Sequence, residues 1–193
     1  MNTIKCQASI ELIEKKSRFI GNIKPIANLG EAKDFINEMK AKYIDARHNC
    51  TLYRFYKDKE FLKYDDDKEP KSTAGKPMAE VARLMDVCNF VLVVSRYFGG
   101  IKLGASGLIR TYAKTAKLSI LEAKLISFVK MSEIEFEFSY ENTKILEQVL
   151  VKVEAQILSK NFEKNIKYKI KIPSAKLEIL QGLDFLEKIK YFS

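Results

Sequence analysis

Residues 89–124 read NFVLVVSRYFGGIKLGASGLIRTYAKTAKLSILEAK, and this stretch decides the fold of the domain around it. Its opening run of Phe and Val, up to Arg96, is typical of a strand that is buried on both faces. Four glycines between residues 99 and 107 predict a loop in which the backbone turns sharply. The apolar spacing of residues 108–124 predicts a long helix. We therefore expect a domain built on a central strand, a glycine-rich loop and a helix.

The residues before this stretch supply further elements of an N-terminal, mixed α/β domain. Periodicity predicts strands at residues 4–14, 17–26 and 48–56 and a helix at residues 28–42. Asn28 is a favourable N-cap for that helix. Residues 57–77 have no sustained periodicity, so we expect a long loop there. A helix is expected from Pro77 to about Val87, because the fixed φ of proline suits a first helical position.

The residues after Lys124 have their own pattern and predict a second domain, so the expected domains are residues 1–124 and 125–193. The predicted elements are a strand at 126–140, a helix at 141–153, two strands within 155–173, a helix at 174–183 and a short strand at 186–193. Ser174 is expected to cap the second of these helices. The βαββα(β) order is typical of a ferredoxin-like sandwich, and the whole chain is expected to be α+β.

The net charge is unevenly distributed. The 193 residues include 34 Lys and Arg against 25 Asp and Glu, a formal net charge of +9. Residues 1–124 hold 23 of these basic and 15 of these acidic residues, so the excess belongs to the N-terminal domain. Such a domain attracts nucleic acid, anionic metabolites or an acidic protein. A lysine-rich surface that only keeps the protein in solution is the alternative.

Composition also indicates where the protein resides. No run of about 18 apolar residues is present, so no membrane-spanning helix and no membrane partner are expected. The N-terminal residues lack the apolar segment of a secretory signal. Cys6, Cys50 and Cys88 are odd in number and widely spaced, which suits free thiols in a reducing compartment. We therefore expect a cytoplasmic protein.

The glycine-rich segments do not complete a known catalytic or nucleotide-binding motif. Gly75 and Lys76 resemble part of a phosphate loop, but Pro70 and Pro77 stand where that motif needs glycine and a hydroxyl residue. The later glycines lack the spacing of a dinucleotide-binding motif. They do not complete a nucleophile elbow either, because Leu108 stands where that motif needs its last glycine. Backbone amides and Lys76 at a helix N-terminus are still able to bind an anion. A plain capping turn with an exposed lysine is the alternative.

Basic and aromatic side chains surround the second glycine-rich loop. Arg96, Lys102 and Arg110 suit contacts with phosphates, and the rings of Tyr97 and Phe98 suit stacking on bases. The alternative is that both rings belong to the core and fix the loop.

Metal and cofactor signatures are absent from the sequence. The single histidine, His48, and three dispersed cysteines lack the ligand spacing of a zinc site. Asp65, Asp66, Asp67 and Glu69 form the densest acidic cluster. They are able to hold a hard cation, to line a solvated loop, or to neutralise arginines such as Arg96 and Arg110. These alternatives stay open, and we expect no cofactor.

Four motifs in this order and spacing resemble the IMPACT/YigZ family. They are KSRFIG (16–21), DARHNC (45–50), DDDKEPKSTAGKP (65–77) and SRYFGGIKLGASGLIRTY (95–112). With the βαββα(β) pattern behind them, the resemblance covers essentially the whole chain. It implies a first domain of the left-handed βαβ type, similar to a ribosomal-protein domain and to domain IV of elongation factor G. It implies a second domain similar to the ferredoxin-like domains of that factor.

The family pattern assigns candidate residues in both loops and in the predicted strand at 48–56. It falls here on Arg47, His48, Asp66, Asp67, Glu69, Pro70, Thr73, Ala74, Gly75, Lys76, Pro77, Arg96, Tyr97, Gly99, Gly100, Leu103, Gly104, Gly107 and Tyr112. With their neighbours, the candidate ligand-binding residues are Arg47, His48, Asp66, Glu69, Thr73, Gly75, Lys76, Arg96, Tyr97, Phe98, Gly99, Gly100, Lys102 and Arg110. No catalytic residue is assigned.

Three positions depart from the family, which usually has glycine where this chain has Lys68, Ser72 and Ser106. Non-glycine residues resist positive φ angles, so we expect the loop conformations to differ locally.

The residues and the resemblance support three functional hypotheses. The first is binding of RNA or the ribosome in a basic cleft lined by Arg47 and both glycine-rich loops. The second is regulation of translation through a protein partner, because the resemblance implies eukaryotic relatives that are translational regulators. The third is a hydrolase-type enzyme that acts on a phosphorylated or acidic small molecule with His48 and Asp66 or Glu69. We rank RNA or ribosome binding first and the enzyme second; the oligomeric state stays open.

Overall fold

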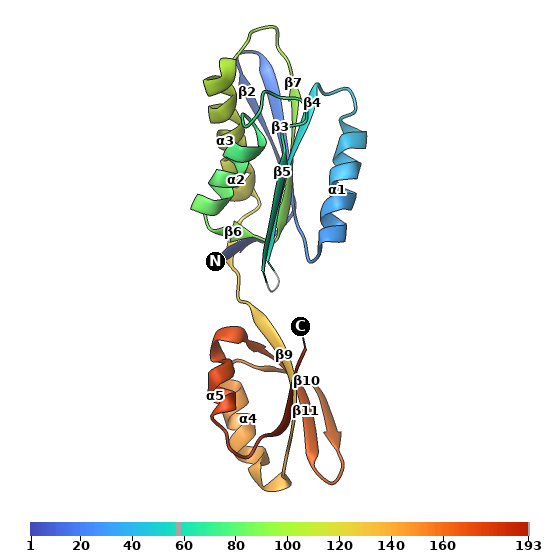
Figure 1. The fold of residues 1–193 in the computed structure, drawn as a ribbon, viewed down its shortest axis with the longest axis vertical. Helices are drawn as coiled ribbons and strands as arrows, with labels where there is room; N and C mark the ends of the chain where they lie inside the picture. Colours follow the sequence, from blue (N-terminus) through green and yellow to red (C-terminus); the bar gives the residue numbers. More distant parts are fainter. Residues whose placement is uncertain (57–58, 193) are drawn as a thin grey trace. The chain divides into compact units, whose positions relative to one another are not determined.

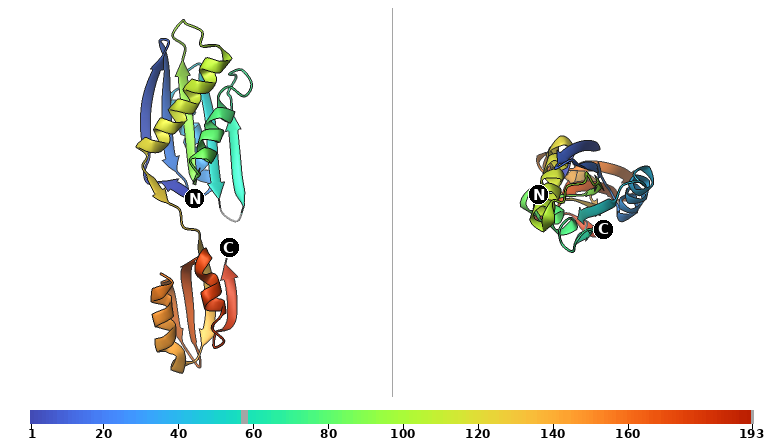
Figure 2. Two further views of the ribbon diagram at one scale, coloured as in Figure 1. Left: turned by 90° about the vertical axis from the view of Figure 1, so that its left-hand side faces the viewer. Right: turned by 90° about the horizontal axis from the view of Figure 1, so that it is seen from above.

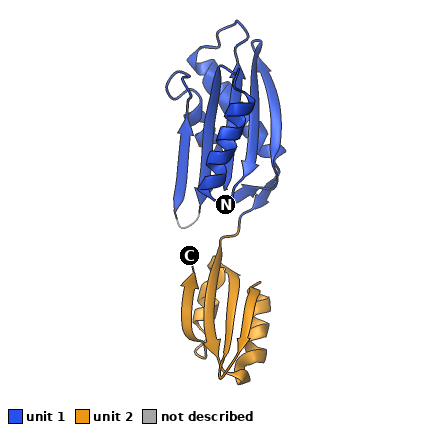
Figure 3. Cartoon of the chain, turned by 90° about the vertical axis from the view of Figure 1, so that its right-hand side faces the viewer, with its two compact units in different colours: residues 1–128 blue, residues 129–193 orange. Residues whose placement is uncertain are grey.

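The computed structural model describes residues 1–56 and 59–192 and confirms the predicted α+β class (Figure 1). Among the described helices, none is long and apolar enough to cross a membrane. The chain forms two compact units, Met1–Phe128 and Val129–Ser193 (Figure 3).

A five-stranded sheet forms the centre of the first unit, in the order β2-β3-β7-β4-β5. Its strands are β2 (Ala8–Glu14), β3 (Ser17–Pro25), β7 (Phe90–Tyr97), β4 (His48–Tyr56) and β5 (Glu60–Asp65). Every neighbouring pair is antiparallel. The middle strand, β7, is buried from Phe90 to Arg96, as its run of Phe and Val predicts.

Helices cover both faces of this sheet. α1 (Leu29–Lys42) lies on one face, and α2 (Gly75–Leu84) and α3 (Gly104–Glu122) lie on the other (Figures 1 and 2). The predicted cap of α1 is present, because the Asn28 side chain accepts a hydrogen bond from the N–H of Glu31 at 3.0 Å.

Successive side chains of β7 point to opposite faces of the sheet and belong to two separate apolar clusters. Phe90, Leu92 and Val94 pack with residues of α2 and α3, whereas Val91 and Val93 pack with residues of α1. Each such side chain contributes about 1.5–3 kcal/mol when it is fully buried.

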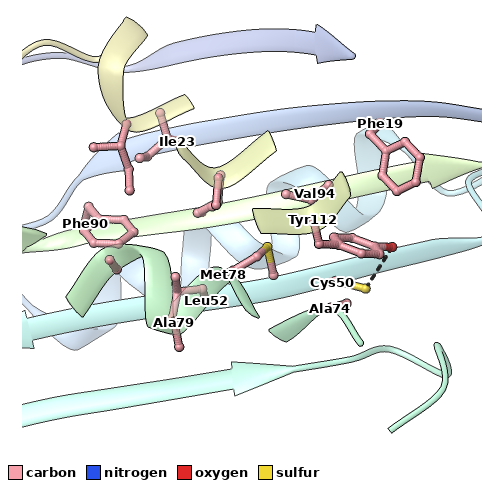
Figure 4. Packing of buried hydrophobic residues seen from close by; sticks show 14 of the residues in the cluster. Phe19, Ile23, Cys50, Leu52, Ala74, Met78, Ala79, Phe90, Val94 and Tyr112 are labelled. Atoms are coloured by element: carbon pink, nitrogen blue, oxygen red, sulfur yellow. Dashed lines mark hydrogen bonds between the residues drawn. The ribbon is translucent and has the colours of Figure 1, made fainter. Parts of the chain in front are cut away.

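Tyr112 of α3 sits at one end of the larger cluster (Figure 4). Its ring meets the ring of Phe19 edge-on, with centroids 5.2 Å apart. Its hydroxyl accepts a hydrogen bond from the Cys50 thiol at 3.3 Å. The phenol is fully buried, so its oxygen lies within the core rather than at the surface.

Several element boundaries differ from the sequence predictions. Within the expected loop, of which Lys57 and Asp58 lie outside the described residues, the chain forms strand β5. β5 is an edge strand with mostly exposed side chains, so its pairing with β4 rather than an apolar pattern stabilises it. Helix α2 begins at Gly75 rather than Pro77 and ends at Leu84, and β6 (Val87–Cys88) follows it.

A small second sheet in the order β6-β1-β8 was also not predicted. β1 (Asn2–Ile4) and β8 (Leu125–Ser127) are separate from β2 and β9 (Met131–Phe138), where single long strands were expected. The chain leaves strand geometry after β1 because the N–H groups of Lys5 and Cys6 donate to the carbonyl of Ala123, at the end of α3.

The second unit has the predicted βαββα(β) order. Its elements are β9 (Met131–Phe138), α4 (Thr143–Lys152), β10 (Gln156–Phe162), β11 (Ile166–Pro173), α5 (Leu177–Gln181) and β12 (Glu187–Phe192). The sheet order is β10-β11-β9-β12, with every neighbouring pair antiparallel. Ser174 does not cap a helix: it lies in a 3₁₀ turn, and its hydroxyl shares a hydrogen bond with that of Ser132.

Candidate functional site

Arg96 continues the core-facing series of β7. It follows Phe90, Leu92 and Val94 at intervals of two, so the same alternation that builds the core turns a guanidinium toward the face of the sheet that α2 and α3 cover. Arg96 is only 6% exposed. Its charge is balanced by Glu69, whose Oε1 atom lies 2.6 Å from Arg96 Nη1.

Glu69 connects three elements at this point. Tyr112 of α3 donates a hydrogen bond to its Oε1 atom at 2.8 Å. Burial raises the pKa of the Tyr112 phenol, which keeps it a neutral donor. Nε2 of His48, at the start of β4, lies 3.8 Å from Glu69 Oε2. Because the carbonyl of Asp67 accepts a hydrogen bond from His48 Nδ1 at 2.8 Å, Nε2 is the ring nitrogen that faces the carboxylate.

A pocket of about 460 Å³ opens beside this buried pair. Its lining residues are Arg47, His48, Lys68, Glu69, Pro70, Arg96, Phe98, Lys102, Leu103, Gly104, Ala105 and Leu108. Four cationic side chains therefore surround one carboxylate. The pocket brings Lys68, Glu69 and Pro70 of the first loop together with Phe98 and Lys102 of the second. We call it the Arg96 pocket.

Phe98 presents an aromatic surface in the Arg96 pocket. Its side chain is 39% exposed, although it is apolar. The guanidinium carbons of Arg47 and Arg96 lie 5.5 and 5.8 Å from the centre of its ring. Both separations are within the range of cation–π attraction. The ring is thus held by two arginines and still accessible to a ligand.

The N-terminus of α3 forms another part of the wall, through Gly104 and Ala105. In the described structure, the N-cap residue Leu103 makes no side-chain capping bond, and the first turn contains no acidic residue. The first N–H groups of a helix have no partner within the helix, and they carry partial positive charge. This helix end therefore adds to the positive potential of the pocket.

The N-terminus of α2 is different, because Asp66 already occupies it. The Asp66 carboxylate accepts hydrogen bonds from the N–H groups of Ser72 at 2.7 Å, Ala74 at 3.0 Å and Gly75 at 2.7 Å. Of the two alternatives for Gly75 and Lys76, an anion site or a capping turn with an exposed lysine, these contacts favour the capping turn. Lys76 is exposed and does not line the Arg96 pocket.

The neighbouring carboxylates also bind the backbone. Asp67 accepts a hydrogen bond from the N–H of Asn49 at 2.6 Å, and Asp65 accepts one from the N–H of Asp67 at 2.7 Å. Across residues 1–56 and 59–192, no three His, Cys, Asp or Glu side chains are grouped to hold a metal ion. Of the three alternatives for the acidic cluster, Glu69 fits the neutralisation of Arg96. The three aspartates instead bind backbone N–H groups, a role that none of the alternatives included.

Other predicted site residues lie outside the pocket. The Thr73 hydroxyl donates to the carbonyl of Pro70 at 2.6 Å and is buried. Tyr97 donates to the Asp45 carboxylate at 2.7 Å, and this bond raises the pKa of Tyr97 to about 12. Gly99 packs so closely on the backbone of Lys16 that a Cβ would overlap the Lys16 carbonyl. Gly100 is exposed, with a φ of 87°.

Arg110 lines a second depression of about 240 Å³, together with Glu14, Lys15, Gly107, Thr111 and Lys114. Leu103 lines both this depression and the Arg96 pocket, so the two adjoin beside the first turns of α3. Arg110 is thus close to the predicted cleft but not part of the Arg96 pocket itself. We call this feature the Arg110 depression.

Two of the departures from glycine adopt the conformation that glycine would favour. Lys68 has a φ of 67° and Ser72 a φ of 62°, so the expectation that they avoid positive φ is wrong. Ser106 lies in the first turn of α3, where glycine has no such advantage.

The candidate ligand-binding set left out Lys68, Leu103, Gly104 and Tyr112, although the family pattern already includes the last three. Tyr112 carried a usable signal, because it follows Leu108 by four residues on the same face of a predicted helix. Lys68 carried none, since its place in the pocket depends on how the loop folds.

The fold and the pocket define an α+β protein of two units whose first unit carries a cationic, aromatic pocket at the start of a helix. Residues 15–120, more than half of the 193 residues, match the family model of the Impact N-terminal domain. The chain therefore belongs to the IMPACT family, which confirms the resemblance seen in its motifs.

Similar proteins include two bacterial members of this family. The chain is 41% identical to IMPACT family member YvyE of Bacillus subtilis (strain 168) in an alignment of 138 residues that covers 67% of this chain and 62% of that protein. It is 30% identical to IMPACT family member YigZ of Escherichia coli (strain K12) in an alignment of 192 residues that covers 96% of this chain and 91% of that protein. A crystal structure of a hypothetical protein aligns with a TM-score of 0.64 at 25% identity, covering 100% of this chain and 96% of that one.

Proposed function

We propose that this protein binds RNA, free or within the ribosome, through the Arg96 pocket and the Arg110 depression, and that it acts in the regulation of translation. The observation that carries the proposal is the grouping of four cationic side chains, an uncapped helix start and the exposed ring of Phe98. Cationic groups bind phosphates, and an aromatic ring between them stacks on a base.

Single-stranded RNA fits this arrangement better than a duplex. Its bases are free to leave the strand and stack on a ring, whereas paired bases are not. Among the described residues that line the pocket, Phe98 is the one with a phenyl ring, so one base per site is expected to stack. The other contacts are electrostatic and carry little sequence information.

On the open sheet face of the second unit, lysines and glutamates lie opposite one another. Lys167, Lys169 and Lys171 of β11 lie opposite Glu137, Glu135 and Glu133 of β9. Ion pairs between these strands include Lys169 with Glu133 at 3.2 Å. Because each of these lysines lies opposite a glutamate, this face is nearly neutral. We therefore assign the binding of RNA to the first unit.

The family resemblance adds the context of translation. It implies similarity of both domains to parts of elongation factor G, and eukaryotic relatives that are translational regulators. A protein partner associated with translation is therefore part of the proposal.

Salt dependence of binding to a single-stranded RNA oligomer tests the proposal. The slope of log affinity against log salt is expected to be about −0.7 per phosphate contact, so three to four contacts give about −2 to −3. Arg47→Ala and Lys102→Ala should each make the slope shallower by about 0.7. Lys33→Ala is the matched control, because Lys33 is exposed on α1, across the sheet from the pocket. Failure to bind RNA or ribosomal particles at low salt would exclude this function.

A second candidate function is hydrolysis of a small phosphorylated compound in the same pocket. The observation that favours it is the approach of His48 Nε2 to Glu69 within a cationic pocket. A neutral Nε2 is able to take a proton from an attacking water while arginines hold the phosphate. Release of inorganic phosphate from a panel of phosphorylated metabolites, lost in Glu69→Gln and His48→Gln, would support it; no release excludes it.

A further inference from the structure

We propose that the Arg96 pocket holds the terminal phosphate of an RNA strand and that the next part of the strand crosses the Arg110 depression. This inference rests on the proposed function and names the part of the RNA that is recognised.

Arg96 has a side-chain nitrogen without a partner. Its Nη1 atom is paired with Glu69, but its Nε atom has no hydrogen-bond partner among the described residues. The side chain is only 7% exposed, so solvent does not satisfy this donor freely. Buried donors are nearly always satisfied. Arg96 itself lines the pocket, so a small shift of its side chain would turn this covered nitrogen toward a phosphate bound there.

The pocket carries an excess of positive charge. Arg47, Lys68, Arg96 and Lys102 carry four positive charges in the pocket, and Glu69 carries one negative charge. An internal phosphodiester brings one negative charge, whereas a terminal phosphate brings about 1.5 to 2 at neutral pH. The excess of positive charge, together with the start of α3, is matched better by a terminal phosphate.

The volume of the pocket suits one nucleotide. A pocket of about 460 Å³ is in the range of sites for one small ligand. It therefore suits a single end nucleotide, with its phosphate near Arg96 and its base on Phe98.

The Arg110 depression gives the strand a direction. Lys15, Arg110 and Lys114 line it, and Leu103 joins it to the Arg96 pocket. Exposed cations of this kind neutralise backbone phosphates without reading the sequence. A strand whose end lies in the pocket meets these side chains next.

Fluorescence anisotropy with three versions of one RNA hexamer tests the inference. The versions carry a 5′-phosphate, a 3′-phosphate, or hydroxyls at both ends, which separates the two possible sources of a terminal phosphate. One phosphorylated version is expected to bind at least about tenfold more tightly than the hydroxyl version, because it makes additional charge-assisted hydrogen bonds.

Variants separate the two parts of the site. Lys102→Ala, at an exposed position of the pocket, should reduce the preference for the phosphorylated end toward unity. Arg110→Ala should weaken all three versions by the same factor and leave the preference unchanged. Lys33→Ala, on the opposite side of the sheet, should change neither, and the far-ultraviolet circular dichroism of each variant verifies its folding.

The outcomes distinguish the two proposals. Equal binding of the three hexamers, with a steep salt dependence, overturns the terminal-phosphate inference and leaves RNA binding intact. Absence of binding by all three at low salt overturns both. Loss of the end preference in Arg110→Ala rather than in Lys102→Ala would contradict the assignment of the phosphate to the Arg96 pocket.

Discussion

Nη1 of Arg96 lies 2.6 Å from Oε1 of Glu69, and the two side chains are only 7% and 1% exposed. The two charges therefore interact in a nearly dry environment. When one partner of such a pair is removed, the other is left as an uncompensated buried charge.

Glu69→Gln should lower the free energy of unfolding by about 3 kcal/mol or more, because Arg96 then loses its counter-charge. Urea denaturation measures this change. Glu80→Gln breaks the exposed pair with Arg83 and is the matched control, with an expected loss of about 0.5 kcal/mol or less. Equal losses in the two variants would contradict the buried character of the Arg96–Glu69 pair.

Lys68→Gly and Ser72→Gly should each stabilise the protein by about 0.3–1 kcal/mol. A left-handed backbone conformation is costly for a residue with a Cβ, and the greater freedom of unfolded glycine offsets only part of the gain. Ser106→Gly, in the first turn of α3, should instead cost about 0.5 kcal/mol. Thermal and urea unfolding should show a gain in stability for the first two variants and a loss for Ser106→Gly. A change of the same sign in all three would contradict the effect of the left-handed backbone conformation.

Phe98→Ala should weaken RNA binding by about 1–3 kcal/mol without changing the salt slope, because it removes stacking and no charge. Tyr97→Phe should leave the affinity unchanged, since its hydroxyl donates to Asp45 outside the pocket. Anisotropy titrations at two salt concentrations measure both effects. Unchanged affinity in Phe98→Ala would contradict the assignment of stacking to this ring.

The three cysteines should differ sharply toward a thiol reagent. Cys6 is exposed, whereas Cys50 and Cys88 are buried. Burial raises the pKa of Cys50 and raises that of Cys88 to about 11, so both stay protonated at pH 8 and only rising pH produces their thiolates. Because the thiolate is the reactive form, one thiol should react quickly in the native protein and three after unfolding. Ellman's reagent counts them, and rapid reaction of all three in the native state would contradict the buried positions.

Much of the scaffold follows from local patterns in the sequence. The buried strand at Phe90–Arg96, the Asn28 cap and the βαββα(β) order all depend on residues close together in the chain. Strand β5 was missed because the ladder with β4, not its own residue pattern, holds it in place. The small sheet of β1, β6 and β8 depends on pairing between distant segments, which periodicity does not reveal.

The site was harder to predict than the scaffold. Alternation along β7 already places Arg96 on the same face as Val94, so its approach to the core was available from the sequence. The choice between Asp66 and Glu69 as its partner was not, because both lie in one loop. Only the folded loop shows that Asp66 turns to backbone amides while Glu69 reaches Arg96.

The three amides bound by Asp66 have a consequence for local opening of the chain. Ser72, Ala74 and Gly75 belong to a stretch that connects β5 to α2, and such stretches usually exchange their amide hydrogens quickly. Here one carboxylate, directly after β5, holds all three N–H groups at the start of the helix. We therefore expect the strand end, the connection and the helix start to open together. Their amide hydrogens should exchange with deuterium at one common slow rate, as a single cooperative unit.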